Sequence, residues 1–470
     1  MPNAQTREDP EDSHAGSTAN PVALNAIVRA AEIYSIVASE DIVDVRGVKL
    51  WAKNQPVSAS LQQRLLERKL SKPLESCLAA EDGVSLITLQ EDFERFMAEP
   101  TPLVQGLRPW AEGVGQQLRQ LPLHSVAQLL LTTALANRPE MVTHAVQAMA
   151  LMGALATKYL GQAMDVRMAM LAGLLHDIGE IYIQPEYLDP GRSMDLLGHK
   201  HLVVHPRVAQ LLLDSTTDYP RAIGRAVGEH HERLNGSGYP ARLRQPDLSP
   251  LGRMLAVTEV TLGIARAQSA PLTRASFALR VLPGEFDPQY IGFISDMARR
   301  VAEPAVADVP APASLVCNPL AEIQQRAALA SELHAQLQAL GGEAQALEIA
   351  DTASTRLERL KVAWNSLGYW GAQHAEITVR ERLELHMADR ELGQRLRDLD
   401  RECLLLAERI SPLEREMLSP LWQSLHLAQP RLMSCQRGTQ GARKAIGGMM
   451  EGLLLPRPLK DFDRYDRIRA

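Results

Sequence analysis

The stretch MDVRMAMLAGLLHDIG at 164–179 is apolar on nearly every side if it forms a helix. Such a helix is stable only when other elements surround it, so we expect it at the centre of a helical domain. Long stretches elsewhere are dominated by Ala, Leu, Arg, Glu and Gln, which favour helices. Aromatic residues make up 4% of the chain, a low fraction for a β-sandwich or barrel. The sequence therefore predicts a mainly α protein.

A chain of 470 residues is too long for a single hydrophobic core and should divide into domains. The first residues are polar and acidic, which favours disorder, and four prolines lie between 304 and 319, as in a linker. We expect, in chain order, a disordered tail at 1–20, a small α+β module at 21–100 (the N-terminal module), a helical domain at 101–303, a Pro/Ala linker at 304–319 and a helical region at 320–470.

The segments on either side of the helical domain carry weaker patterns. In the N-terminal module, apolar and polar residues alternate around Gly47, which predicts a short hairpin. The spacing of apolar residues at 60–83 predicts a helix, and a role in packing alone is an open alternative for this module. After residue 320, long amphipathic segments with alternating charges predict either a helical bundle or a coiled-coil dimer.

Charge and cysteine usage exclude several classes of protein. The formal net charge is -6 and the pI is near 6.1, so we expect no nucleic-acid-binding surface. The sequence lacks the long apolar runs that would predict a signal peptide or a transmembrane helix. The four cysteines are scattered without CxxC pairs, as in a reducing compartment. We therefore expect a cytoplasmic protein without a membrane or nucleic acid polymer as partner.

Histidines and carboxylates between 140 and 259 form the candidate site. Glu140 and His144 are four positions apart, on one face of a predicted helix. Asp177 ends the most apolar helix, where an unpaired carboxylate would be costly. His230 and His231 cannot share a helix face and can therefore ligate two different ions. Imidazoles and carboxylates suit iron, manganese or zinc, and two such ions about 4 Å apart can hold a bridging hydroxide and a phosphoester.

Three motifs identify a family resemblance. HDIG at 176–179, HP at 205–206 and HHERLNGSGYP at 230–240 resemble the HD-GYP family, a branch of the HD phosphohydrolases. The resemblance covers roughly 124 to 300, including GEFDP near the end of the domain. It implies an all-helical HD-type core and a metal-dependent phosphodiesterase that cleaves cyclic di-GMP to pGpG or GMP with a metal-bound hydroxide.

The resemblance also implies which residues hold the metals. Glu259 stands where the family usually has Asp, and Glu140 matches a glutamate that accompanies a third metal in some members. We therefore expect two or three divalent ions, iron or manganese, with zinc as an alternative. Asp177, with His176, is expected to be catalytic, as bridging ligand and proton acceptor. The implied metal ligands are Glu140, His144, His176, Asp177, His205, His230, His231 and Glu259.

The substrate side departs further from the family. Gly236 and Gly238 can form a turn that places Tyr239 and Pro240 beside the metals. Basic residues that the family usually has are missing, and we expect Arg266, or else Arg274, to compensate. The departures from the family pattern are Glu180, Asp189, Asn235, Gln268 and Pro271.

These departures leave three hypotheses open. The first is an active cyclic di-GMP phosphodiesterase. The second is a phosphohydrolase of the same chemistry with a different phosphoester substrate. The third is a catalytically weak receptor or scaffold that signals through the C-terminal helices, as a homodimer or with a signalling partner.

Overall fold

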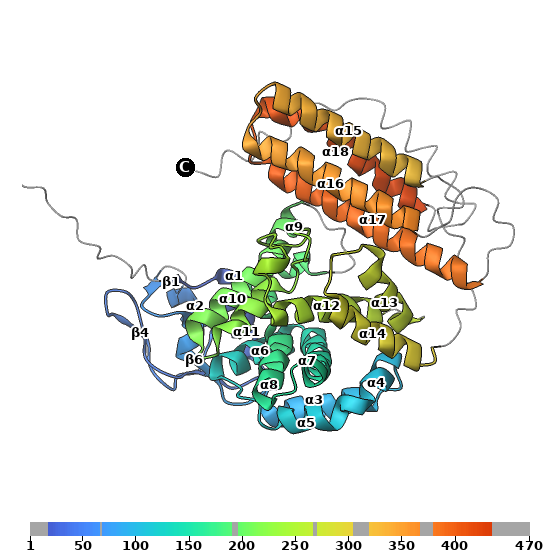
Figure 1. Ribbon diagram of the computed structural model, residues 1–470. Coiled ribbons are helices and arrows are strands. Elements are labelled where there is room, and N and C mark those ends of the chain that lie inside the picture. Colours follow the sequence, from blue (N-terminus) through green and yellow to red (C-terminus); the bar gives the residue numbers. More distant parts are fainter. Residues whose placement is uncertain are drawn as a thin grey trace, which may run out of the picture. The chain divides into compact units, whose positions relative to one another are not determined.

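The computed structural model describes residues 17–65, 68–189, 196–266, 270–303, 319–366 and 379–434. The chain divides into two compact units, Met1–Ala305 and Val306–Ala470 (Figure 1). The N-terminal module and the predicted helical domain lie together in the first unit, so the boundary near residue 100 stays a prediction. The predicted linker, apart from Pro319, lies outside the described residues, as do residues 1–16 and 435–470 of the two predicted terminal segments.

The N-terminal module combines short strands with helices. Its elements are β1 (Ser17–Thr18), α1 (Pro21–Ala30), β2 (Ile36–Ala38), β3 (Ile42–Val43), β4 (Lys49–Trp51), α2 (Ala59–Leu65), β5 (Lys69–Leu70), the 3-10 helix η1 (Leu74–Cys77), β6 (Leu78–Ala80) and α3 (Leu86–Ala98). The strands form three antiparallel pairs, β1–β5, β2–β6 and β3–β4. The β3–β4 pair is the predicted hairpin, and Gly47 lies in its turn with φ +78°.

Two predictions for this part of the chain were wrong. Residues 17–20 do not belong to a disordered tail, because Ser17 and Thr18 pair with β5 and the Asn20 side chain caps α1. The predicted helix at 60–83 ends at Leu65. Leu70 and Leu78 instead lie on short strands, where they are buried in a core that the N-terminal module forms with Leu129.

The helical domain is built around two apolar helices. The remaining elements of the first unit are α4 (Pro102–Leu107), η2 (Arg108–Trp110), α5 (Ala111–Leu118), α6 (Ser125–Asn137), α7 (Pro139–Tyr159), α8 (Ala163–Leu175), η3 (Ile178–Tyr182), η4 (Pro185–Tyr187), α9 (Leu196–Val203), α10 (His205–Thr216), α11 (Arg221–Glu229), η5 (Gln245–Asp247), α12 (Pro250–Ala265), α13 (Pro271–Val281) and α14 (Pro288–Arg300). Helix α8 packs against α5, α7, α11 and α12, which confirms its predicted central place. Gly173 allows α7 and α8 to approach closely, because a Cβ there would meet the Ala148 backbone at 2.8 Å.

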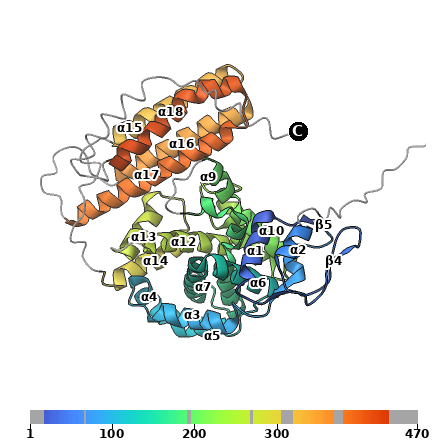
Figure 2. The same ribbon diagram turned by 180° about the vertical axis from the view of Figure 1, so that it is seen from behind.

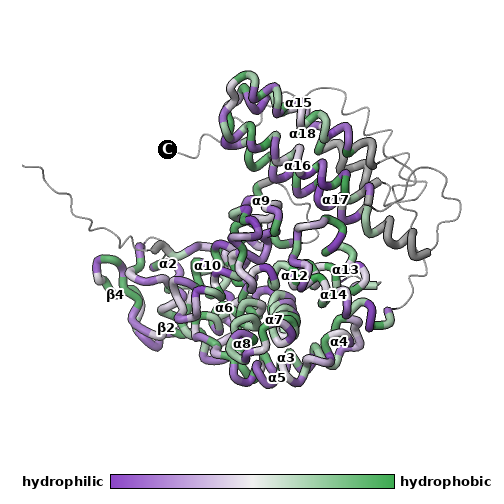
Figure 3. Tube along the Cα trace, in the orientation of Figure 1, coloured by the Kyte–Doolittle hydropathy of each residue, from purple (hydrophilic) through white to green (hydrophobic). Residues whose placement is uncertain are grey.

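The distribution of hydrophobic residues and the packing of α1 on α6 are consistent with a helical core around α7 and α8. Hydrophobic residues follow α7 and α8 inside the first unit, whereas hydrophilic residues are frequent along α16 and α17 of the second unit (Figure 3). Helices α1 and α6, which come from opposite sides of residue 100, lie side by side (Figure 2). The N-terminal module therefore shares a packed interface with the helical domain.

The second unit contains four helices among its described residues. They are α15 (Pro319–Ala339), α16 (Ala344–Ser366), α17 (Val379–Ala407) and α18 (Pro412–Ser434). Consecutive helices pack together and α15 also packs on α18, so the helices form a four-helix bundle within one chain. Arg326 links the first and last helices, since its Nε donates to the Ser424 carbonyl at 3.0 Å. The predicted dimer stays a prediction.

No helix in the described part of the chain combines the length and apolarity that crossing a lipid bilayer requires.

Candidate metal centre

Seven of the predicted metal ligands gather into two neighbouring groups. We call His144, His176, Asp177 and Glu259 the first ligand group, and His205, His230 and His231 the second ligand group. Within each group, one potential ligand atom per residue lies within 4.8 Å of all the others. The seven side chains come from elements spread between residues 144 and 259, so the fold brings together what the motifs list separately.

Helix ends place most of these side chains. His176 caps the C-terminus of the apolar helix α8, and Asp177 follows it directly. His205 begins α10, with Pro206 in the first turn. His230 caps the C-terminus of α11. Gly179 lets the HD motif approach α10, because a Cβ there would lie 2.1 Å from the His205 carbonyl oxygen.

Asp177 connects the two groups. Its Oδ2 lies 3.0 Å from His176 Nε2 and 3.6 Å from His144 Nε2, within the first ligand group. Its Oδ1 lies 3.5 Å from Nε2 of both His205 and His230, in the second ligand group. The two oxygens of one carboxylate therefore face different groups, as a ligand that bridges two ions must.

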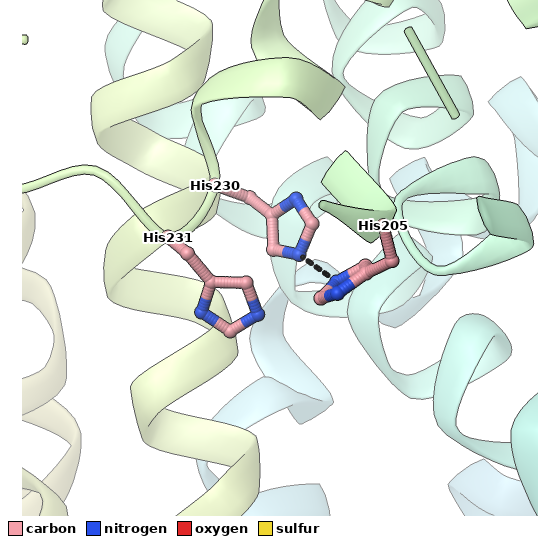
Figure 4. Close-up of side chains that lie close together, drawn as sticks. All are labelled: His205, His230 and His231. Carbon is pink, nitrogen blue, oxygen red and sulfur yellow. Dashed lines mark hydrogen bonds between the residues drawn. The ribbon is translucent and has the colours of Figure 1, made fainter. Parts of the chain in front are cut away.

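The other contacts within the groups are equally short. Glu259 Oε2 lies 3.1 Å from His144 Nε2 and 3.3 Å from His176 Nε2. Figure 4 shows the second ligand group, in which Nε2 of His205 and Nε2 of His230 are 3.1 Å apart. Glu259, which has one methylene more than the Asp usual in the family, therefore still places its carboxylate beside His144 and His176.

Backbone carbonyls orient three of the imidazoles. Nδ1 of His176 lies 2.8 Å from the Gly173 carbonyl oxygen, and Nδ1 of His205 lies 2.6 Å from that of Leu202. His230 makes the same contact with Val227 at 2.6 Å. A neutral imidazole that donates through Nδ1 presents an unprotonated Nε2, which is the form that ligates metals.

This arrangement fits divalent ions. In their neutral forms, His205 and His230 would point two Nε2 lone pairs at each other across 3.1 Å, and a cation between them removes that repulsion. The separations of 3.0–3.6 Å between ligand atoms match neighbouring ligands that bind one ion at about 2.1 Å. A set of imidazoles and carboxylates suits iron, manganese and zinc.

The electrostatics of the carboxylates also suit ligation. Burial raises the pKa of Asp177, but the neighbouring histidines, His176 first, outweigh burial and hold it well below its usual range. Burial likewise raises the pKa of Glu259, and His144 and His176 lower it further than burial raises it. Both carboxylates are therefore ionised at neutral pH, as metal ligands must be.

The GYP loop at 235–240 lies against the second ligand group. Gly236 has φ +78°, and the Asn235 side chain accepts a hydrogen bond from the Ser237 backbone at 2.9 Å. Gly238 permits close packing, because a Cβ there would lie 2.4 Å from the His231 carbonyl oxygen. The Tyr239 ring stacks on His231 at 4.6 Å between centroids. Pro240 follows through a cis peptide bond.

Other predicted site residues lie apart from the two groups. The Glu140 side chain is 70% exposed and contacts Arg138 at 3.3 Å, so binding of a third ion by Glu140 stays a prediction. Arg266 is exposed at the end of α12, and its contact with substrate also stays a prediction. Pro271 is buried at the start of α13. Gln268 lies outside the described residues.

Two sets of contacts near the site were not predicted. Arg138 Nη1 binds Glu180 Oε2 at 2.8 Å, an ion pair between residues 42 positions apart. Burial first, and then the charge of Asp177, raise the pKa of Glu180, which places this carboxylate within the field of the centre. Glu232 is buried and accepts hydrogen bonds from the backbones of Ala241 and Leu243, so it holds the segment that directly follows the GYP loop. The sequence signal that could have pointed to Glu232 is its position directly after His230 and His231.

Comparison with known proteins relates the region of the site to HD domains. Residues 130–274 match the family described as HD domain. A stretch of 155 residues is 38% identical to the cyclic di-GMP phosphodiesterase PA4108 of Pseudomonas aeruginosa and covers 31% of this chain and 36% of that protein. A stretch of 166 residues is 28% identical to 3'3'-cGAMP-specific phosphodiesterase 1 of Vibrio cholerae and covers 33% of this chain and 37% of that protein.

The matched regions thus span little more than a third of the length of these relatives. Among solved structures, Bd1817, a HDG"Y"P protein from Bdellovibrio bacteriovorus, aligns with a TM-score of 0.32 and 16% identity over 57% of this chain and 94% of its own. The family match, the relative from Pseudomonas aeruginosa and the HD and GYP motifs at 176–177 and 238–240 agree. Residues 130–274 therefore match an HD domain, and the motifs of this region resemble those of the HD-GYP family.

Proposed function

We propose that this protein is a metal-dependent phosphodiesterase that hydrolyses cyclic di-GMP. The observation that carries the proposal is Asp177, whose two oxygens face separate ligand groups. The matched regions of relatives named as cyclic di-GMP and 3'3'-cGAMP phosphodiesterases support a cyclic dinucleotide as substrate. Addition of water across one P–O3′ bond gives pGpG, and a second hydrolysis gives GMP.

The residues of the chain would hold the reaction in place. Divalent ions bound by the two groups would act as Lewis acids on the phosphoester and make water a stronger nucleophile at neutral pH. Asp177 sits between the groups and holds them at a fixed separation. The carbonyls of Gly173, Leu202 and Val227 orient three imidazoles, whose Nε2 atoms would be available to hold the ions. Tyr239, stacked on His231, supplies an aromatic wall beside the second ligand group.

Binding without turnover is a second candidate, and the Arg138–Glu180 pair favours it. The substrate carries two phosphodiester charges, so it needs cations beside the metals. Arg138 is one such cation, but its guanidinium is paired with Glu180, whose carboxylate adds negative charge near Asp177. A charge-assisted hydrogen bond contributes roughly 1.5–3 kcal/mol, so competition for Arg138 would weaken substrate binding considerably.

Product analysis separates the two candidates. Full-length protein loaded with iron or manganese should convert cyclic di-GMP to pGpG, and comparison with 3'3'-cGAMP as substrate would show which cyclic dinucleotide is preferred. Chromatography of the products is the measurement. Binding of cyclic di-GMP with no pGpG or GMP, in protein that carries iron, manganese or zinc, would establish the receptor instead.

Removal of the metals should also destabilise the first unit. Ions that bind only the folded state stabilise it by about 2.7 kcal/mol at a free concentration of 100 times the dissociation constant. Chelation should therefore lower the free energy of unfolding by roughly that amount, and addition of the metal should restore it. Denaturant unfolding followed by circular dichroism measures the change. A chelator that leaves the unfolding curve of metal-loaded protein unchanged would contradict the proposed centre.

A further inference from the structure

We infer that the N-terminal module helps to position the metal centre. Its residue Glu75 holds Tyr182, and Tyr182 in turn holds the turn that carries Asp177. We call residues 177–182 the HD turn, which consists of Asp177 and the 3-10 helix η3. Glu75 and Tyr182 are positioning residues that act through Asp177. The inference rests on the proposed metal centre and adds a role for the module.

The contact itself is a partly buried hydrogen bond between distant parts of the chain. The Tyr182 hydroxyl donates to Glu75 Oε1 across 107 positions of sequence. Glu75 is 8% exposed on η1 of the N-terminal module. Burial, and then the charge of Glu75, raise the pKa of Tyr182 well above its usual value, so the hydroxyl stays a donor at neutral pH. A carboxylate buried in this way needs its donor, because an unpaired buried charge is costly.

Three contacts made by single residues help to hold the HD turn. Gly179 lies against the His205 backbone on α10. Glu180 binds Arg138, which precedes α7, the helix of His144. Tyr182, at the last position of η3, binds Glu75. The first two attachments lead to elements that carry metal ligands, whereas the third leads to the N-terminal module.

The turn transmits this third attachment to Asp177 over a short distance. The Glu180 backbone donates to the Asp177 carbonyl at 2.8 Å, and the Ile183 backbone donates to the Glu180 carbonyl at 3.0 Å. The 3-10 turn between Asp177 and Tyr182 is thus closed by consecutive hydrogen bonds. Helices α1 and α6 also pack on η3. A displacement of Tyr182 therefore reaches Asp177 through one short rigid element.

The size of the effect follows from similar contacts. Partners that orient metal ligands typically change metal affinity 10–100-fold when they are mutated. Tyr182 acts through the HD turn and does not touch a ligand, so we expect the lower limit of that range, about tenfold. A module that only packs against the helical domain would change the stability of the fold and leave the affinity for metal unaltered.

The test uses full-length protein and matched variants. Tyr182→Phe removes only the hydroxyl, Glu75→Ala removes the acceptor, and Glu75→Gln keeps an amide oxygen that can accept from Tyr182. Tyr219→Phe is the control, because its hydroxyl also makes a long-range contact, with Pro122 and His124, but on elements outside the HD turn. Manganese affinity, measured by competition with a chelator, is read beside hydrogen exchange of residues 177–183 and the melting temperature.

We expect Tyr182→Phe and Glu75→Ala each to weaken manganese binding about tenfold and to speed exchange at 177–183. The double variant should lose no more affinity than either single variant, Glu75→Gln should stay near wild type, and Tyr219→Phe should change the melting temperature alone. Wild-type affinity and exchange in both Tyr182→Phe and Glu75→Ala would overturn the inference. Failure of wild-type protein to bind any metal would refute the proposed centre, and the exchange of 177–183 would then decide the inference by itself.

Discussion

Replacement of Asp177 by asparagine should abolish turnover of cyclic di-GMP and empty the metal centre. Asparagine keeps the size of the side chain but loses the charge and offers a single acceptor oxygen, so it cannot serve both ligand groups. Loss of metal assistance removes several kcal/mol of transition-state stabilisation, which corresponds to a fall in kcat of roughly a thousandfold or more. Steady-state kinetics and metal analysis of the same preparation measure both effects.

Asp165→Asn is the matched control for this experiment. Asp165 lies in the first turn of α8, the helix that ends at His176, so the same substitution on the same helix leaves the ligand groups intact. The control should keep its metal and its turnover. If Asp177→Asn retained both metal and turnover, Asp177 could not be the bridge between the two groups.

Gly179→Ala should both destabilise the fold and disturb the second ligand group. A Cβ at this position would lie 2.1 Å from the His205 carbonyl oxygen and 3.0 Å from the Ala209 backbone nitrogen. The turn and α10 must then separate, and His205 begins that helix. Overpacking of this kind costs about 1–3 kcal/mol, and the shift of His205 should lower the affinity for metal as well. Denaturant unfolding and metal titration are the measurements.

Gly263→Ala is the matched control, and we expect it to leave the fold and the metal centre intact, although its helix also carries a predicted ligand. Gly263 lies on α12, four positions after Glu259, and a Cβ there would meet nothing within 4 Å. Because alanine favours a helix over glycine by up to about 1 kcal/mol, this variant should be slightly more stable and keep its metal. Equal stability and metal affinity in the two variants would refute the close approach at Gly179.

The side chains of the two groups could be singled out from the sequence because their signals are local, and their role as metal ligands stays a prediction. His176 and Asp177 end a helix whose apolar pattern fixes its central place, and His230 and His231 precede a glycine-rich turn. The HD-GYP resemblance joined these separate signals into one site. The structure adds how these side chains divide into two groups, with one oxygen of Asp177 facing each group.

Contacts between distant residues could not be predicted. The Arg138–Glu180 and Glu75–Tyr182 pairs join positions 42 and 107 residues apart, and a single sequence carries no signal for such pairs. The strands β5 and β6 were missed for a similar reason. Their partners β1 and β2 lie far earlier in the chain, so pairing overrode the helical spacing of 60–83. Tertiary contacts routinely outweigh local propensity in this way.

Anomalous diffraction from a crystal of metal-loaded protein tests the central claim most directly. We predict two separate peaks, one within His144, His176, Asp177 and Glu259 and one within His205, His230 and His231, with the Asp177 carboxylate between them. Absence of anomalous density at both groups, in protein that contains the metal in solution, would contradict the proposed centre.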